Sequence, residues 1–338
     1  MQDEMAATEG DVLMPIVDTR CEVVEQPQVV ARVLEDLHYQ VRELARILAE
    51  RQIDLVLSSG SGDSWFAAQA VRLAWERYAG VPMEAMQAYE YAAYGRPGIS
   101  ARTAHFVISS SGRPTTTWDA LDRALKSPAL VIGVTDNDST DNPFRTRPPF
   151  ALVPRAVKVG WPTQTTTATI AVLLDLAIAF GEARGHLNHD AARSLEGEVR
   201  ALPDRMAEVL ERSWEWAEKV VPTLVGQRVY TLVGGGPSYA VAQTGASLMA
   251  EGPQEVGVAL TAEEFHHALR VATLQQGEPV ILIAPGGEGE ARSRDTARVV
   301  REWGARLLAL VTPETADLLE EEMDGIQIVQ VSEPFSPL

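Results

Sequence analysis

Short apolar segments that alternate with helical segments constrain the fold of this chain most strongly. In the first half they are residues 53–59, 105–110, 129–135 and 150–154, and in the second half residues 228–234, 279–285, 307–312 and 326–331. Continuous apolar strands of this length are typical of parallel sheets that helices cover on both faces. The pattern therefore predicts an α/β fold with helices on both sides of each sheet.

The pattern also repeats within the chain. The segment from Gly60 to Trp65 (GSGDSW) returns 174 residues later as Gly234 to Tyr239 (GGGPSY), and Gln69 matches Gln243 at the same offset. Two copies of one α/β unit are the simplest explanation. A chain of 338 residues with 46% hydrophobic residues is long enough to build two such cores.

Charge limits the partners of the protein. The formal net charge is −18, and only three of the 29 basic residues are lysines: Lys126, Lys158 and Lys219. A nucleic-acid-binding protein normally carries a basic face, which this composition does not suggest. An anionic ligand would need local hydrogen-bond donors, because the net field of the protein repels it.

Cysteine content and the amino terminus favour a cytoplasmic protein. Cys21 is the sole cysteine, so no disulfide or cysteine-rich metal site is expected within one chain. The first residues, MQDEMAATEGD, are acidic and unlike a signal peptide. The longest apolar stretch, Thr167 to Phe180, is short for a membrane span and contains Asp175, so we expect it to be a core helix.

A hydroxyl-rich loop follows the second apolar run. Residues 109–117 read SSSGRPTTT. Serine and threonine hydroxyls, with backbone N–H groups at a helix start, suit a phosphate dianion. A loop that only caps a helix, with Thr115 or Thr116 as N-cap, is the alternative. The second repeat has Ala284 and Pro285 in place of serines, which assigns a phosphate site to the first half.

These motifs resemble the sugar isomerase (SIS) family. The resemblance rests on Gly60 to Ser64, on Ser109 to Gly112 and on the segment from Glu251 to His267, in that order. More closely, the chain resembles double-SIS proteins, such as the isomerase half of glucosamine-6-phosphate synthase and the ketosamine-6-phosphate deglycases. The resemblance implies two SIS domains, each a flavodoxin-like, three-layer unit with a parallel sheet.

The resemblance sets expected boundaries and a binding site. Residues 1–24 are expected to form an N-terminal tail, residues 25–190 the first SIS domain and residues 191–338 the second. It implies that hydroxyls and backbone around the two first-half loops hold the sugar phosphate: Ser61, Gly62, Ser64, Ser109, Ser110, Ser111, Thr115, Thr116 and Thr163. Thr163 belongs to a segment before an apolar helix, where N-capping explains the threonines equally well. Pro114 stands where the family usually has a threonine.

The same resemblance implies an acid–base pair. Glu251 and His267 are sixteen residues apart, as are the family's base and histidine. Glu251 would abstract a proton from the sugar carbon, and His267 would assist ring opening. A solvated glutamate at a helix end and a histidine in a crevice are the structural alternatives. A zinc site is disfavoured, because the adjacent His266 and His267 cannot easily bind the same ion.

Departures from the family narrow the expected reaction. Leu248 replaces a lysine of the synthase, and Ala268 follows the histidine where the family has glycine. Residue 2 is Gln2, so the synthase's glutaminase cysteine is not expected here. We expect a deglycase or an aminosugar-phosphate isomerase or deaminase without a cofactor or metal, in a homodimer that binds neither nucleic acid nor membrane. A non-catalytic sugar-phosphate sensor is the alternative, and the glycines after residue 285 lack a dinucleotide-binding pattern.

Overall fold

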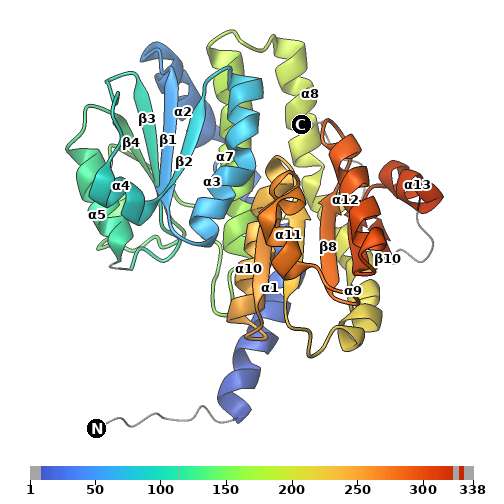
Figure 1. Cartoon of the computed structure of the whole chain (residues 1–338). Coiled ribbons are helices and arrows are strands. Elements are labelled where there is room, and N and C mark those ends of the chain that lie inside the picture. Colours follow the sequence, from blue (N-terminus) through green and yellow to red (C-terminus); the bar gives the residue numbers. More distant parts are fainter. Residues whose placement is uncertain (1–8, 114, 323–326, 331–338) are drawn as a thin grey trace.

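Two parallel sheets, one per half of the sequence, form two lobes that lie side by side (Figure 1). The computed structural model describes residues 9–113, 115–322 and 327–330. The first sheet contains β1 (Leu55–Gly60), β2 (Met83–Gln87), β3 (Thr103–Ile108), β4 (Leu130–Val134) and β5 (Phe150–Leu152). The second contains β6 (Tyr230–Gly234), β7 (Gly257–Thr261), β8 (Pro279–Ala284), β9 (Arg306–Val311) and β10 (Gln327–Gln330).

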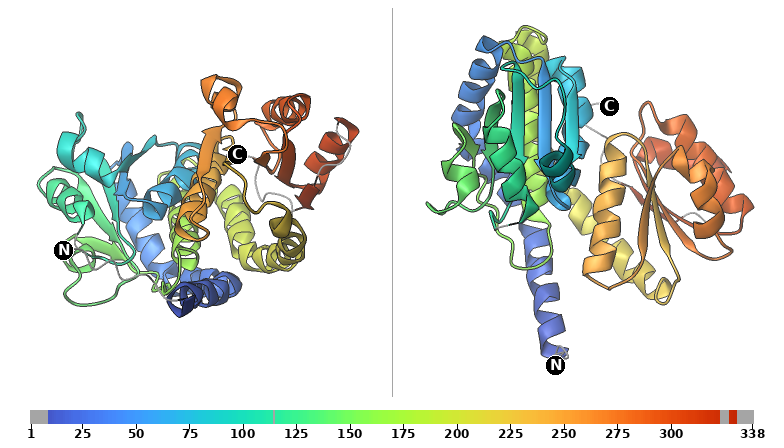
Figure 2. Two further views of the ribbon diagram at one scale, coloured as in Figure 1. Left: turned by 60° about the horizontal axis from the view of Figure 1, so that its bottom comes forward. Right: turned by 60° about the vertical axis from the view of Figure 1, so that its left-hand side comes forward.

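The two sheets have the same topology. Their strand orders are β2-β1-β3-β4-β5 and β7-β6-β8-β9-β10, and all pairs are parallel. This is the flavodoxin-like order, in which the chain reverses direction across the sheet between the first and third strands. The predicted α/β class, with helices on both faces of each parallel sheet, is confirmed (Figure 2).

Helices cover the first sheet on both faces. They are α1 (Glu9–Asp36), α2 (His38–Glu50), α3 (Asp63–Ala74) with a π-helical turn (Trp75–Ala79), α4 (Ala88–Tyr94), α5 (Thr116–Leu125), α6 (Pro143–Thr146) and α7 (Gln164–Ala183). One face packs against α1, α2, α3 and α7, and the other against α4 and α5. Helix α7 is long and apolar enough to cross a membrane, but 78% of its most apolar window is buried. It is the core helix predicted around Asp175.

The second lobe is built in the same way. Helix α8 (His189–Arg200) leads into it, and its own helices are α9 (Leu202–Val220), α10 (Pro237–Glu251), α11 (Ala268–Thr273), α12 (Glu290–Glu302) and α13 (Pro313–Glu322), with short 3₁₀ turns at Val221–Thr223 and Glu264–His266. Helices α3 and α10, which the sequence repeat relates, pack against each other between the lobes. A Cβ placed on Gly236 would lie 3.5 Å from Leu73 Cδ1, which shows how closely the two copies approach.

Two expected boundaries differ from the structure. Residues 9–24 are not a tail but the first half of α1, and Glu22 is buried there against the 159–163 segment. The boundary at residue 191 falls inside α8, whose Ala192 and Val199 belong to the core of the first sheet. Helix α8 therefore packs with the first half, because its apolar side chains complete that core.

Candidate functional site

The loops after β1 and β3 flank the reversal point of the first sheet and come together in one small pocket. Parallel α/β folds usually bind ligands at such a point, beyond the carboxyl ends of the strands. The pocket has a volume of about 150 Å³. Its lining is Ser61, Asp63, Ser64, Ile108, Ser109, Ser110, Ser111, Thr115, Thr117 and Lys158.

Most of the predicted phosphate-binding residues therefore lie around one space. Ser61 and Ser64 come from the β1–α3 turn, and Thr115 comes from the start of α5. Gly62 makes the turn, with a φ of 55° that a side chain would strain. Thr116 and Thr163 do not line the pocket. Thr116 is exposed on α5, and Thr163 points its hydroxyl at Glu22 Oε2, 3.4 Å away.

Hydrogen bonds to the backbone hold the serine loop in place. The carbonyl of Ser110 accepts from the backbone N–H groups of Asp136 (3.0 Å) and Asn137 (3.2 Å). The Trp118 indole donates to the Gly112 carbonyl at 3.0 Å, and Asn137 Nδ2 donates to the Ser111 carbonyl at 3.0 Å. Because these bonds use carbonyls, they fix the loop without using the hydroxyls of Ser109 and Ser111 as donors, whereas the Ser110 hydroxyl bonds to Asp136.

Thr115 serves the helix and still faces the pocket. Its Oγ1 accepts from the Thr117 N–H at 3.3 Å, which makes it the N-cap of α5. Thr115 thus has the capping role considered as an alternative to phosphate binding. A hydroxyl can accept one hydrogen bond and donate another, so capping leaves the Thr115 proton available to a ligand. The two roles are compatible.

Three polar lining residues are outside the predicted set: Asp63, Thr117 and Lys158. Lys158 is the one cation among the described lining residues, and it is exposed. Because the chain has only three lysines, Lys158 could have been noticed from the sequence as a candidate site residue. Asp63 begins α3, where the helix dipole favours a carboxylate, and Thr166 Oγ1 donates to it at 3.4 Å. The pocket therefore carries both signs of charge.

Asp136 lies behind the serine loop and has a perturbed acidity. Burial raises its pKa to about 6, and the Asp63 carboxylate adds to this rise. Hydrogen bonds from the Ser110 side chain and from the Ala156 N–H, the latter at 3.0 Å, oppose the rise. Asp136 therefore changes charge near neutral pH, next to the loop that holds the hydroxyls.

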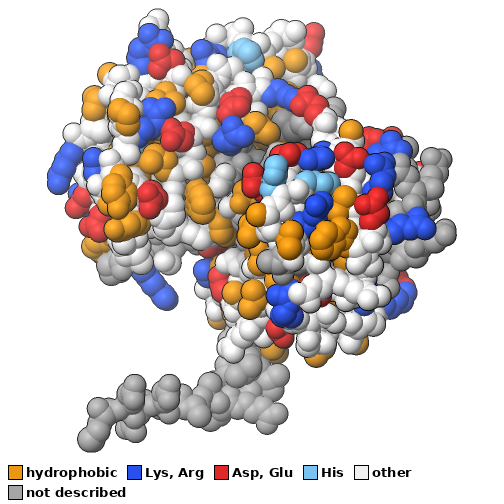
Figure 3. Space-filling model, in the orientation of Figure 1, with side chains coloured by type: hydrophobic (Ala, Val, Ile, Leu, Met, Phe, Trp, Pro, Cys, Tyr) orange, Lys and Arg blue, Asp and Glu red, His pale blue; other side chains and the backbone are white. Residues whose placement is uncertain are grey.

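The predicted acid–base residues lie on the second lobe and have different partners. Glu251 ends α10, is exposed, and accepts from Ser247 Oγ at 3.2 Å. His267 precedes α11 and places Nε2 at 3.2 Å from Glu263 Oε1. Among the described residues, neither lines the serine pocket. Figure 3 shows histidines among charged side chains on the second lobe, where it faces the first.

One segment of the first lobe touches both the pocket and the end of α10. Lys158 lines the pocket, and three residues later Trp161 packs against Gly252, which follows Glu251. Thr19 and Glu22 of α1 hold this segment: Trp161 N donates to Thr19 Oγ1 at 2.8 Å, and Gly160 N donates to Glu22 at 3.2 Å. The carboxyl end of α10 is thereby placed beside the segment that carries Lys158.

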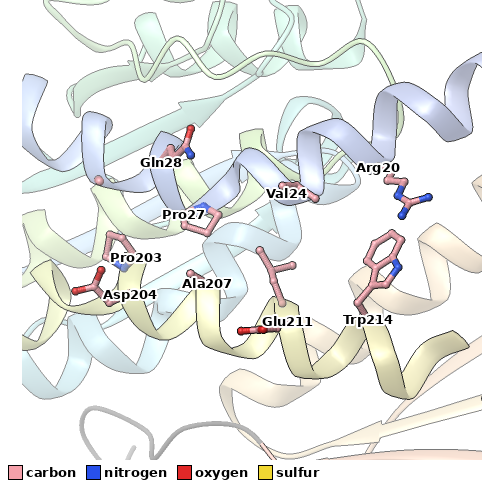
Figure 4. Close-up of a pocket in the computed structure, with 11 residues that line it drawn as sticks. Arg20, Val24, Pro27, Gln28, Pro203, Asp204, Ala207, Glu211 and Trp214 are labelled. Atoms are coloured by element: carbon pink, nitrogen blue, oxygen red, sulfur yellow. The ribbon is translucent and has the colours of Figure 1, made fainter. Parts of the chain in front are cut away.

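A larger groove lies elsewhere, between α1 and α9. Its volume is about 640 Å³, and Arg20 stacks over the Trp214 ring at one end, 4.5 Å from the ring centroid (Figure 4). Its walls are mainly apolar side chains, and it contains none of the predicted site residues. The predicted phosphate-binding residues meet in the small serine pocket and not in this groove.

Comparison with known proteins shows similarities in sequence and in fold. No protein-family model matches the chain. The chain is 28% identical over 326 residues to a glutamine–fructose-6-phosphate aminotransferase (isomerizing) of Rhizobium leguminosarum bv. viciae, covering 94% of this chain and 53% of the relative. The chain thus spans about half the length of this curated relative.

Solved structures share the fold of the chain. One is the C-terminal domain of glucosamine-fructose-6-phosphate aminotransferase from Francisella tularensis, with a TM-score of 0.79, 17% identity and coverage of 92% of this chain and 87% of that one. Another is tagatose-6-phosphate ketose/aldose isomerase from Escherichia coli, with a TM-score of 0.70, 14% identity and coverage of 93% and 84%. The chain is therefore similar in sequence and fold to the isomerase (SIS) part of the aminotransferases.

Proposed function

We propose that this chain acts on a 6-phosphorylated ketose or ketosamine, as a deglycase or as an aminosugar-phosphate isomerase or deaminase. The serine pocket binds the phosphate, Glu251 is the base, and His267 is the acid that opens the sugar ring. The observation that carries the proposal is the convergence of Ser61, Ser64, the three loop serines and Thr115 on one pocket. The similarity of the chain to phosphosugar enzymes supports a sugar phosphate as the ligand.

The pocket has the donors that a phosphate needs in an acidic protein. The amino ends of α3 and α5 border it, and both helices are at least ten residues long. Helix amino termini present unpaired N–H groups and a partial positive charge. Together with the hydroxyls and Lys158, they stabilise an anion that the net charge of −18 would otherwise repel.

The proton transfer needs a base beside the sugar carbons. Glu251 takes a proton from the carbon next to the carbonyl, and the electron pair forms an enediol or enolamine. Reprotonation at the neighbouring carbon completes an isomerisation. In an amine-bearing substrate it gives an imine, which water hydrolyses to the carbonyl compound and the free amine, as a deglycase or deaminase requires. The contact between Trp161 and Gly252 supports this role, because it places the end of α10 beside the segment that carries Lys158.

We also propose that the protein works as a homodimer. Among the described residues, His267 does not line the serine pocket of its own chain, which is compatible with its serving the pocket of a second copy. Sedimentation at micromolar concentration tests this: a monomer contradicts the dimer.

A panel of 6-phosphorylated ketoses, aminosugars and ketosamines tests the reaction. Turnover is compared between the wild type, Glu251→Gln and His267→Ala, with Glu255→Gln and His189→Ala as matched controls for charge and residue type. Loss of about 100-fold or more in kcat is expected for the first pair and no change for the controls. Turnover that both test variants retain contradicts the roles, and binding without turnover in the wild type favours a non-catalytic sugar-phosphate sensor.

A further inference from the structure

Glu263 connects His267 to an arginine on another helix. One oxygen of its carboxylate, Oε1, lies 3.2 Å from His267 Nε2, and the other, Oε2, lies 2.5 Å from Arg292 Nη2. Arg292 belongs to α12, which follows the glycine-rich turn after β8. The carboxylate is therefore shared between the predicted acid and a fixed positive charge.

The contact decides which ring nitrogen of His267 carries a proton. A carboxylate oxygen without a proton can only accept a hydrogen bond. Arg292 keeps Glu263 in that form, because its hydrogen bond is the main cause that lowers the pKa of Glu263, and the contact with His267 lowers it further. Nε2 of His267 must then donate, which leaves Nδ1 as the atom that can exchange a proton with a ligand.

Other charges surround the pair. Arg270 on α11 and Asp295 on α12 are close enough to act on the neighbouring His266, and Asp295 also pairs with Arg292 at 3.5 Å. His266 has a separate contact: its Nε2 lies 3.1 Å from Thr296 Oγ1. The two adjacent histidines therefore have different partners, and of the two only His267 pairs with a carboxylate.

We infer that Glu263, held by Arg292, is a positioning residue that keeps the proton of neutral His267 on Nε2 and presents Nδ1 to the substrate. The inference rests on the proposed role of His267. In ring opening, protonated His267 gives its Nδ1 proton to the ring oxygen as the bond between that oxygen and the anomeric carbon breaks. The hydroxyl on the anomeric carbon loses its proton to solvent and becomes the carbonyl. Nε2 keeps its proton throughout, because Glu263 accepts from it.

Nitrogen NMR of the histidine rings tests the positioning role without any substrate. The protein is labelled with ¹⁵N-histidine, and His267→Gln identifies the His267 signals. At a pH where the ring is neutral, wild-type shifts are expected to show Nε2 protonated and Nδ1 unprotonated. In Glu263→Gln the two shifts should move towards those of free histidine, where both tautomers exchange. Glu302→Gln, at the far end of α12, removes the same charge and should leave the shifts unchanged. Identical His267 shifts in the wild type and Glu263→Gln would overturn the inference.

Activity supplies the second readout. Glu263→Gln is expected to lower kcat roughly 10- to 100-fold, as is usual when a partner that orients an imidazole is removed, and to leave KM nearly unchanged. Glu263→Asp should recover part of the rate. A changed KM with an unchanged kcat overturns the positioning role. If the wild type turns over no sugar phosphate, the proposed function fails, whereas the NMR result still decides whether Glu263 controls the ring.

Discussion

The two halves of this chain share a backbone but not a surface chemistry. Gly62 and Gly236 both turn the chain with φ near 55°, and Gly112 and Gly286 both have positive φ after equivalent strands. The side chains differ: in the strand register, Ser109, Ser110 and Ser111 correspond to Ala284, Pro285 and Gly286. Both copies therefore supply helix amino termini at the end of a sheet, and only the first adds serine hydroxyls in this loop. The repeat separates what the fold contributes to anion binding from what the side chains contribute.

The largest expected effect comes from making the first half resemble the second. Ser109→Ala combined with Ser111→Ala removes two hydroxyl donors to a charged ligand, each contributing about 1.5–3 kcal/mol. Affinity for fructose 6-phosphate should fall by roughly 100-fold or more by calorimetry at fixed ionic strength. Ser293→Ala, which removes a second-lobe hydroxyl bonded to the Gly289 carbonyl, is the control. A loss below about threefold would mean that the backbone alone binds the anion.

Ser64 and Ser238 provide a matched pair within the repeat. Both follow the glycine turn by two residues, but Ser64 lines the pocket and Ser238 is buried in the second lobe. Ser64→Ala should weaken sugar-phosphate binding about tenfold, which is the value of one hydrogen bond to a charged group. Ser238→Ala should leave the affinity unchanged. Equal effects of the two substitutions would show that the affinity depends on packing and not on the Ser64 hydroxyl.

The sequence predicted the central strands better than the second strand of each unit. Residues 83–87 (MEAMQ) and 257–261 (GVALT) were not recognised, although they form β2 and β7. Both lie at sheet edges and are mostly half-buried, so they lack the continuous apolar run that marked the interior strands. Apolar residues at helical spacing run through residues 28–50, but the helix is interrupted at Leu37, between α1 and α2. No glycine or proline marks that break, and so local sequence could not reveal it.

The candidate site was predictable where its residues follow a strand end. The resemblance to the SIS family named Ser61, Ser64 and the loop serines, and the structure brings them to one pocket because parallel strands have their carboxyl ends at one edge. Thr116 was predicted, but the next residue, Thr117, is the buried threonine that lines the pocket. Lys158 lies about fifty residues from the serine loop in sequence, and only the packing of α1 against the 159–163 segment brings it to the pocket. Such a contact has no local signature.

Substitution of Lys158 tests whether its positive charge adds to the affinity that the hydroxyls give for an anion. Because its side chain is exposed, its interaction with an anion should contribute only about 0.2–1 kcal/mol. Lys158→Gln is expected to weaken sulfate or sugar-phosphate binding by roughly two- to fivefold at low salt. The difference should disappear in about 0.5 M NaCl, where screening shortens the range of surface charges. Lys126→Gln, an exposed lysine at the end of α5, is the control. A loss that persists in high salt would instead indicate a direct, desolvated contact.

The smallest effect concerns Asp136, whose counterpart in the strand register of the second half is Thr312. With a pKa near 6, its carboxyl loses a negative charge behind the serine loop as the pH falls from 7.5 to 5. Sulfate binding, measured because sulfate stays a dianion over this range, should tighten about two- to threefold on acidification, as expected when one partly screened like charge is removed.

Asp136→Asn separates this carboxyl from other titrating groups. The amide oxygen can still accept from the Ala156 N–H, so the local fold should survive, and sulfate affinity should stay at its acidic value from pH 5 to 7.5. The pH dependence of the free energy of unfolding gives an independent test of the same carboxyl. Burial raises the folded-state pKa above the usual 3.8, so the contribution of the protonated carboxyl is complete below about pH 4 and is lost as the pH rises through about 6. The asparagine variant should lack that loss in urea unfolding. If its affinity and stability follow the wild-type pH dependence, a group other than Asp136 is responsible.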